Sequence, residues 1–230
     1  MFKEKIALVL DMNSTFMFGE DRFDEGEDFS IHYAKCGGNL PNHELDKIIR
    51  VAYEYLSVRY PAEEYRHCFP SVEQAIKNTT VRDWPADELQ KIVDTFSFHE
   101  LGVVPEEYAS ALKQLKQHFT LAVVIDIWSP KAPWLATFER VGIAPLFSAA
   151  SFSSDHGMVK PSPKPFELVL DQLGISNTQA LVIGDSARRD LGGARAAGID
   201  CVLVGGAEHA DAVGHFESLL EFVRTLQQSR

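Results

Sequence analysis

The sequence predicts an α/β fold, with a doubly wound parallel sheet and an inserted helical subdomain. Three observations predict it: short apolar runs that do not alternate with polar residues, helical patterns between the later runs, and an interval of roughly 110 residues between the first two runs. Non-alternating apolar runs are typical of strands buried on both faces. Since a parallel crossover needs only about a dozen residues or slightly more, the long interval indicates an insertion.

Four apolar, β-branched runs are the expected strands of this sheet. They are Ile6–Leu10, Leu121–Ile125, Ala180–Ile183 and Cys201–Val204. A further short run at Phe147–Phe152 is expected to form another strand. Strands that alternate with helical patterns favour a parallel, doubly wound arrangement.

Helices of the core are predicted from apolar residues at helical spacing. One precedes the second strand, one follows Ser162-Pro163, which supply a cap and a first turn, and one closes the chain. Their apolar stripes are Tyr108, Ala111, Leu112, Leu115 and Phe119; Phe166, Val169, Leu170 and Leu173; and Phe216, Leu219, Leu220 and Val223.

The long interval contains helical patterns of its own. These stripes run over Leu45–Leu56, Val72–Ile76 and Leu89–Phe96. The segment Gly19–Leu40 lacks periodicity and contains glycines, so we expect it to be loop. Two units are therefore expected: a core made of residues 1–16 and 99–230, and a helical subdomain made of residues 17–98.

Charge and cysteine content narrow the class of protein. The chain is 45% hydrophobic and 24% charged, with 22 Lys and Arg against 33 Asp and Glu and a net charge of −11, which is typical of a globular protein. Nucleic acids and anionic membrane surfaces need a basic footprint, so neither is expected as a partner.

Three distant cysteines suggest neither a disulfide framework nor a zinc cluster. Because no apolar run is long enough for a signal peptide or a membrane span, we expect a cytoplasmic protein.

Carboxylates follow the predicted strands. Asp11 follows the first, Asp126 the second, and Asp185 the Val182-Ile183-Gly184 end of the third, with Asp190 five residues later. In open parallel sheets the chemistry gathers at the carboxyl ends of strands. Carboxylates that converge there repel one another unless a cation holds them, and Mg²⁺ prefers such oxygen ligands. The alternative is that each aspartate caps a helix. This explanation suits a single aspartate but is not favoured for all of the aspartates that follow the strands.

Lys160 precedes a predicted helix, in the segment Gly157-Met158-Val159-Lys160-Pro161. An ammonium group held at this edge of the sheet neutralises a phosphate and the carboxylates around it. A lone lysine is more often a solvated surface residue. Its occurrence together with Asp11 and Asp185 favours the functional interpretation.

These segments resemble the motifs of the haloacid dehalogenase-like hydrolase superfamily. The matching segments are Asp11-Met12-Asn13-Ser14-Thr15, Val123-Val124-Ile125-Asp126, Lys160-Pro161, and Gly184-Asp185-Ser186 together with Asp190 and Gly192-Gly193-Ala194. Four motifs in order cover essentially the whole chain. The resemblance implies a Rossmann-like core with a helical cap inserted after the first strand, which agrees with the pattern of the sequence.

The resemblance also implies roles for individual residues. In phosphatases of the superfamily, the residue matching Asp11 attacks phosphorus and forms an aspartyl-phosphate. Mg²⁺ is then held by Asp11, by the backbone carbonyl of Asn13 and by Asp185. Asp190 orients Lys160 or a metal-bound water, and Asp126 lies at a polar position that supports the nucleophile loop and phosphate binding. The implied partner is a small phosphorylated metabolite.

Two departures from the superfamily pattern limit this expectation. Phosphatases of this type usually have a second aspartate where this chain has Asn13, and an amide cannot exchange a proton usefully. General acid–base catalysis raises the reaction rate about a hundred- to ten-thousandfold. Its loss slows the hydrolysis of alkyl phosphates most, because the leaving groups of aryl and acyl phosphates need no proton. Ile125 replaces the usual Ser or Thr, whose hydroxyl contacts the phosphoryl group. Ser129 is an alternative donor, although we expect it to cap a helix before Pro130.

Three hypotheses about function follow. The first is a Mg²⁺-dependent phosphohydrolase with weak or specialised activity, because Asp11, Lys160, Asp185 and Asp190 are all present. The second is a catalytically silent relative that binds a phosphorylated ligand or a protein partner. The third is a metal-independent haloacid dehalogenase, which would not need the Gly184-Asp185 motif. Candidate substrate-selecting residues in the cap are Arg22, His32, Tyr33 and Lys35.

Overall fold

The core of the protein is a single parallel sheet. A computed structural model describes residues 2 and 4–228, and the strand order in this part of the chain is β3-β2-β1-β4-β5-β6. The strands are β1 (Ala7–Leu10), β2 (Thr120–Ile125), β3 (Phe147–Phe152), β4 (Ala180–Gly184), β5 (Asp200–Leu203) and β6 (Gly214–His215). Every pair is parallel, so the predicted α/β fold is confirmed.

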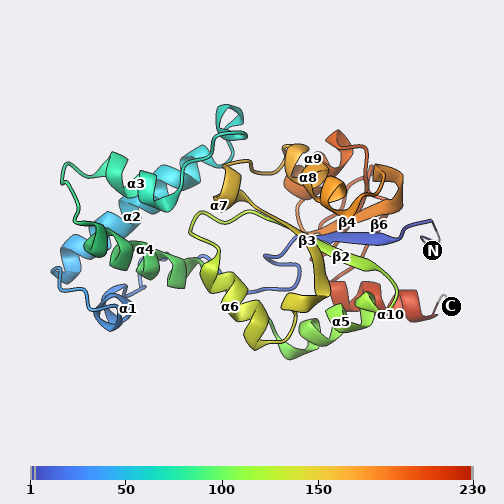
Figure 1. The fold of residues 1–230 in the computed structure, drawn as a ribbon, viewed down its shortest axis with the longest axis horizontal. Helices are drawn as coiled ribbons and strands as arrows, with labels where there is room; N and C mark the ends of the chain where they lie inside the picture. The colour runs from blue at the N-terminus through green and yellow to red at the C-terminus, as the bar shows by residue number, and fades with distance from the viewer. Residues whose placement is uncertain (1, 3, 229–230) are drawn as a thin grey trace.

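Helices cover both faces of the sheet (Figure 1). They are α5 (Glu106–Lys116), α6 (Ala132–Arg140) and α10 (Leu219–Gln228) on one face, and α8 (Lys164–Leu173) and α9 (Gly192–Ala196) on the other, with the short α7 (Ser153–His156) after β3. Among the described residues, no helix is both long enough and apolar enough to cross a membrane.

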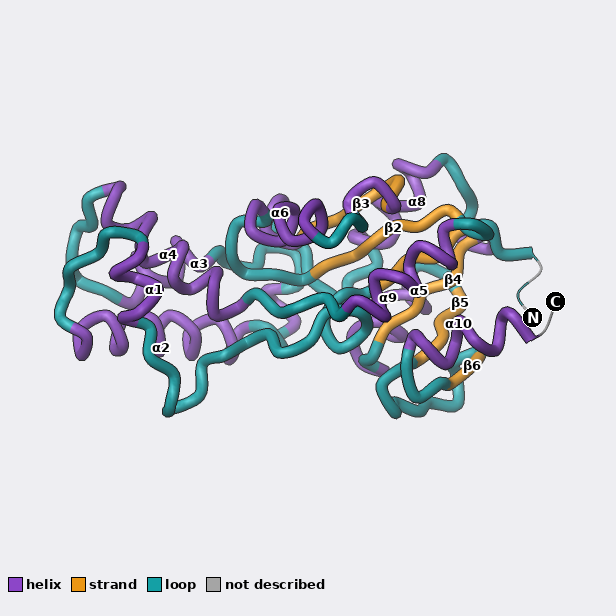
Figure 2. The backbone as a smooth tube through the Cα atoms, turned by 90° about the horizontal axis from the view of Figure 1, so that it is seen from below, coloured by secondary structure: helices purple, strands orange, loops and turns teal. Residues whose placement is uncertain are grey.

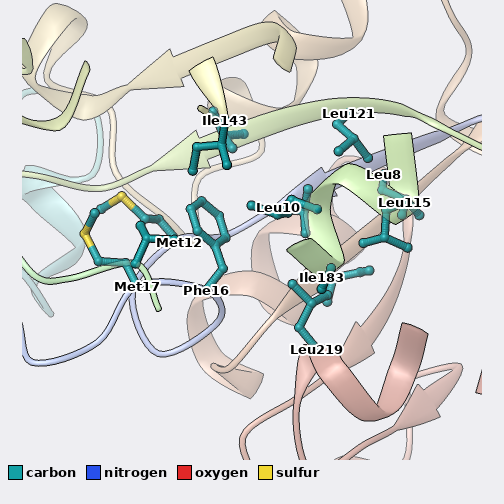
Figure 3. Packing of buried hydrophobic residues seen from close by; sticks show 14 of the residues in the cluster. Leu8, Leu10, Met12, Phe16, Met17, Leu115, Leu121, Ile143, Ile183 and Leu219 are labelled. Atoms are coloured by element: carbon teal, nitrogen blue, oxygen red, sulfur yellow. The ribbon is translucent and has the colours of Figure 1, made fainter. Parts of the chain in front are cut away.

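The central strand β1 explains why two layers of helices form. All four of its residues are buried, and successive side chains of a strand point to opposite faces. Leu8 and Leu10 therefore pack with Leu115 of α5 and Leu219 of α10, as Figure 3 shows. Val9 packs in a separate cluster with residues of α8 and α9. A run that is apolar on both faces thus requires helices on both sides of the sheet.

A group of helices lies apart from the sheet, at the end of the molecule opposite the termini (Figure 2). It comprises α1 (Ser30–Lys35), α2 (Asn42–Arg59), α3 (Val72–Thr79) and α4 (Ala86–Glu100), and we call it the helical lobe. The lobe has its own buried cluster, which includes Ile49, Ile76 and Phe96. Two of the stripes predicted from the sequence, in α2 and α4, supply much of this cluster because they are buried along one side of each helix.

The two chain segments that join lobe and core lie side by side. Phe18 and Val103 form an antiparallel bridge, with their backbone hydrogen bonds at 2.8 and 2.9 Å. The guanidinium of Arg22 donates to the carbonyl oxygen of Leu101 at 2.7 Å and also to that of Phe98. Arg22, a predicted substrate-selecting residue, therefore holds the connection between lobe and core.

Two expectations at the level of local structure are wrong, and one short strand is not predicted. The segment Gly19–Leu40 is not all loop, because α1 forms within it. Its six residues are too few to show periodicity, and its start is fixed locally where Ser30 donates its N–H to Asp28 Oδ1 at 3.0 Å. Ser129 does not cap a helix, because α6 begins at Ala132. The two-residue strand β6 has no sequence signal and is absent from the predicted strands.

Candidate active site

The site begins at the carboxyl end of β1. Leu10 pairs with Val123 of β2 and with Ile183 of β4, so the three strands end at the same edge of the sheet. Asp11 directly follows, and its N–H donates to the carbonyl oxygen of Ile183 at 2.9 Å. Parallel register thus brings Asp11 beside the residues that follow β2 and β4, as the sequence predicts.

Lys160 is the centre of a buried hydrogen-bonded cluster. Its Nζ donates to Asp11 Oδ1, to Asp190 Oδ1 at 2.9 Å and to the carbonyl oxygen of Val124 at 3.3 Å. Only 3% of the lysine side chain is exposed, against 8% for Asp11 and 1% for Asp190. Burial alone would lower the pKa of Lys160, but the carboxylates of Asp11 and Asp190 raise it well above its usual value. The lysine is therefore a permanent positive charge.

The carboxylates of the site are crowded. Burial raises the pKa of Asp11 to about 7, although the charge of Lys160 opposes this, and burial together with Asp190 also raises the pKa of Asp185. Burial and the repulsion between carboxylates both disfavour their ionised forms, and the charge of Lys160 does not fully offset this. One lysine does not neutralise the group.

A divalent cation fits this deficit. Oxygen atoms of Asp11, Asp185 and Asp190 lie within 4.8 Å of one another. Among the described residues, Asp185 Oδ1 is buried without a hydrogen-bond partner, and such an atom is costly unless something coordinates it. The donor set consists of hard oxygen ligands, which suits Mg²⁺.

The turn after β1 is held rigidly. Met12 and Phe16 are buried, as their neighbouring positions in Figure 3 illustrate. Between them, Ser14 adopts a φ of 55°, a left-handed conformation that is costly for a residue other than glycine and is often found at functional sites. Thr15 Oγ1 donates to Asp11 Oδ2 at 3.3 Å. The predicted nucleophile is thus contacted through both carboxylate oxygens, by Lys160 and by Thr15.

Asn13 and Ile125 occupy the positions that depart from the superfamily pattern. Asn13 Oδ1 is buried and has no hydrogen-bond partner in the described part of the chain. The side chain of Ile125 is completely buried in the core cluster, so it packs in the protein interior. Neither side chain can transfer a proton.

Asp126 connects the helical lobe to Lys160. Its Oδ2 accepts the hydroxyl of Tyr60 at 2.7 Å and the backbone N–H of Lys160 at 3.0 Å. Burial raises the pKa of Asp126, against the lowering effect of Lys160. The sequence motifs imply a role for Asp126 in phosphate binding, and in the structure one of its oxygens holds the backbone of Lys160.

Asp190 is positioned by a π-helical turn, Ala187–Leu191, which directly follows the Gly184-Asp185-Ser186 segment. Single π-helical turns are frequent at functional sites. Asp190 Oδ2 accepts the N–H of Ser186 at 2.9 Å. A Cβ at position 184 would lie 2.3 Å from the Asp190 carboxyl carbon, so the absence of a side chain at Gly184 is what allows Asp190 to reach Lys160.

Other residues around the site were not identified from the sequence. Tyr60, at the end of α2, bonds to Asp126 of the site, and Arg189 of the π-helical turn lies beside the Tyr60 ring. Glu100 supports the loop after β2, because its carboxylate accepts the N–H groups of Trp128 and Ser129 at 2.5 and 3.0 Å. For Tyr60 and Glu100 there is no signal in the sequence, because each contacts the core only through the packing at the end of α2 or α4. Arg189 lies beside Asp190 and could have been found from that neighbour.

The remaining predicted lobe residues lie in different surroundings. Tyr33 is 2% exposed within the buried cluster of the lobe. The ring of His32 stacks on Phe98 with 4.0 Å between centroids. Lys35 lies at the end of α1. None of the hydrogen bonds described above for Asp11, Asp126 and Lys160 involves these three residues.

Comparison with known proteins identifies the family. A family model described as haloacid dehalogenase-like hydrolase matches residues 7–198. The chain belongs to the haloacid dehalogenase-like hydrolase family. The resemblance inferred from the sequence motifs is therefore confirmed.

Curated relatives of this haloacid dehalogenase-like protein include phosphatases. Ribulose-1,5-bisphosphate 5-phosphatase of Halopiger xanaduensis is 27% identical over 113 residues, which are 49% of this chain and 46% of that protein. Phosphoglycolate phosphatase of Yersinia pseudotuberculosis is 36% identical over 105 residues, which are 41% of this chain and 45% of that protein. The matches thus span less than half the length of these relatives.

Solved structures of the same family share the whole fold. The crystal structure of 2-haloacid dehalogenase from Pseudomonas syringae pv. Tomato has a TM-score of 0.62 at 20% identity, and the match covers 98% of this chain and 100% of that one. Identity at this level shows the fold alone. The chain therefore belongs to a hydrolase family whose curated relatives include phosphatases, and its own reaction must be inferred from the site.

Proposed function

We propose that the protein is a Mg²⁺-dependent phosphohydrolase that acts on small phosphorylated metabolites through an aspartyl-phosphate on Asp11. The observation that carries this proposal is the buried cluster in which Lys160 bonds to both Asp11 and Asp190, with an oxygen of Asp185 close to both carboxylates. The relatives named as phosphatases of ribulose-1,5-bisphosphate and phosphoglycolate support the substrate class.

The proposed reaction has two displacements at phosphorus. A carboxylate oxygen of Asp11 forms a bond to phosphorus while the bond to the leaving oxygen breaks, and water then attacks the aspartyl-phosphate, so that inorganic phosphate leaves and the carboxylate is restored. Asp11, Asp185 and the Asn13 carbonyl would hold Mg²⁺, which would offset the negative charge of the phosphate. Lys160 supplies positive charge to Asp11 and is itself fixed by Asp190 and Asp126.

Asn13 determines which phosphate compounds the protein hydrolyses fastest. Its amide accepts a hydrogen bond but does not donate a proton to the leaving oxygen. Aryl and acyl phosphates have leaving groups that are stable without a proton, whereas alkyl phosphates do not. We therefore expect the protein to favour aryl or acyl phosphates over alkyl phosphates.

Residues 17–98 are proposed to be the cap of the site; they contain the helical lobe except for the last two residues of α4, which ends at Glu100. This segment contacts the core close to the carboxylates: Tyr60 bonds to Asp126, and the N–H of Val159 donates to the carbonyl oxygen of Arg66 at 3.0 Å. A lobe in this place excludes water from the reaction and contacts the part of the substrate that does not react.

The test is hydrolysis of phenyl phosphate and an alkyl phosphate by the purified protein, with Mg²⁺ and with a chelator. We expect Mg²⁺-dependent phosphate release that favours the aryl ester and is abolished in Asp11→Asn. Asn13→Asp should raise alkyl ester turnover by about a hundredfold or more, the typical effect of a general acid.

Other outcomes identify the alternative functions. If neither the unsubstituted protein nor Asn13→Asp releases phosphate, the phosphatase proposal is wrong. Halide release from a 2-haloacid in the presence of a chelator would then show a dehalogenase. Tight binding of a phosphorylated ligand without turnover of either kind of substrate would show a silent binding protein.

A further inference from the structure

Arg189 has a guanidinium group whose N–H donors form no hydrogen bond or ion pair with other described residues. The residue is half-buried, and within the described residues no hydrogen bond or ion pair engages its side chain. Arg22, which is also partly buried, donates instead to the carbonyl oxygens of Gly19 and Leu101, and Arg50 is bonded in a similar way. A half-buried guanidinium with five free donors is therefore unusual in this chain.

The position of Arg189 is where the lobe meets the core. Its guanidinium carbon lies 5.5 Å from the centre of the Tyr60 ring, in a cation–π arrangement. The neighbouring Arg188 donates to the carbonyl oxygen of Pro61. Since the Tyr60 hydroxyl bonds to Asp126, the ring that holds Arg189 is part of the wall of the carboxylate site.

The charge of Arg189 acts on this site. Burial alone would lower its pKa, but Tyr60, Asp190, Asp11 and Asp185 raise it above the usual value. The guanidinium is therefore always charged and is close enough to these groups to attract them, although none of the four forms an ion pair with it. Its positive charge lies where the lobe contacts the core, and a charge in such a place attracts anions.

Resting on the function proposed above, we propose that Arg189 selects substrates that carry a carboxylate in addition to the phosphoryl group. The phosphoryl group belongs beside Asp11 and Lys160, whereas Arg189 lies against Tyr60 from the lobe, on the side that receives the rest of the substrate. A planar guanidinium binds a carboxylate through two parallel hydrogen bonds. The contact with the Tyr60 ring limits the positions that the guanidinium can adopt, which reduces the entropy lost on binding.

The experiment compares two ligands that are not hydrolysed, phosphonoacetate and ethylphosphonate, which differ by a carboxylate in place of a methyl group. Binding is measured by calorimetry with Mg²⁺ for the unsubstituted protein, Arg189→Gln, Arg189→Lys and Arg188→Gln. We expect phosphonoacetate to bind about 10- to 100-fold more tightly than ethylphosphonate, the usual effect of a charged hydrogen bond. Arg189→Gln should abolish this preference, Arg189→Lys should retain part of it, and Arg188→Gln should retain all of it.

Three results would overturn the inference. Equal weakening of both ligands by Arg189→Gln would mean that the residue binds the phosphoryl group itself. An unchanged preference in Arg189→Gln, or no preference in the unsubstituted protein, would mean that Arg189 does not recognise the carboxylate. Phenyl phosphate hydrolysis in the same preparations separates the two proposals: if the preference depends on Arg189 but no phosphate is released, anion recognition stands and the phosphatase proposal fails.

Discussion

At the scale of single residues, the site is most tightly constrained at Gly184, where Asp190 leaves no room for a side chain. A Cβ there would lie 2.3 Å from the Asp190 carboxyl carbon, so Gly184→Ala must displace Asp190 from Lys160. We expect a loss of about 1–3 kcal/mol in the free energy of unfolding, as overpacking of a core usually costs. Phosphate release should fall about a hundredfold, since small misplacements of reacting groups have effects of this size. Urea unfolding and steady-state kinetics measure the two effects.

Gly26→Ala is the matched control for this change. Nothing lies within 4 Å of a Cβ at Gly26, and its φ is not in the left-handed region. This variant should therefore unfold and react like the unsubstituted protein. If Gly184→Ala also behaves normally, Asp190 does not depend on the glycine and our account of the π-helical turn is wrong.

At the scale of elements, Glu100 at the end of α4 ties the lobe to the loop after β2. Burial, with the nearby Asp21 adding to its effect, raises the pKa of Glu100 from 4.5 to about 8. The unfolded chain therefore loses this proton at lower pH than the folded one, so the group stabilises the fold less as pH rises from about 4.5 to about 8. Above that range the loss is complete.

Glu100→Gln removes this titration. Between pH 5 and pH 8, the free energy of unfolding of the unsubstituted protein should decrease more than that of Glu100→Gln, by about 1 kcal/mol or more, since one pKa unit corresponds to about 1.4 kcal/mol. Urea unfolding of both proteins at the two pH values measures the difference, in which the other titrating groups cancel. Parallel pH profiles would show that Glu100 is ionised throughout.

At the scale of the whole molecule, Trp128 joins the two parts. It belongs to the loop after β2, yet its ring packs in the lobe cluster, 5.4 Å from that of Tyr53 and 5.9 Å from that of Phe69. Its carbonyl oxygen also accepts the N–H of Val72 at 3.1 Å. Trp128→Ala should cost about 3–5 kcal/mol and should loosen the lobe from the sheet. Hydrogen exchange is expected to rise in α2, α3 and the connecting segments while β1 and β4 stay protected.

Trp84→Ala is the control for this prediction, because Trp84 belongs to the same cluster but hydrogen-bonds within the lobe, to Thr80 Oγ1 at 2.8 Å. It should destabilise the lobe without faster exchange in the segments 18–22 and 99–103 that connect it to the core. The same exchange pattern in both variants would mean that Trp128 acts only through the cluster.

The sheet and the residues that follow its strands could be predicted from the amino-acid sequence alone. Apolar runs fix strands within one or two residues, and parallel register requires that their carboxyl ends meet, so the sequence is enough to place Asp11 and Asp185 together. Lys160 is identified because its motif fixes its place beside them. The placement of the two aspartates depends on local pattern and on one general rule of parallel sheets, whereas that of Lys160 depends on the resemblance to the superfamily motif.

The surroundings of that site depend on tertiary packing. Tyr60, Glu100 and Arg189 gain their contacts from the docking of the lobe on the core, as when Tyr60 bonds to Asp126, 66 positions away in the chain. Side chains so far apart meet through the packing of whole helices, and no periodicity in the sequence encodes where a helix docks. Asp126 becomes the partner of the Lys160 backbone where the segment after β2 packs against the segment before α8, because a buried polar group must find a hydrogen-bond partner nearby.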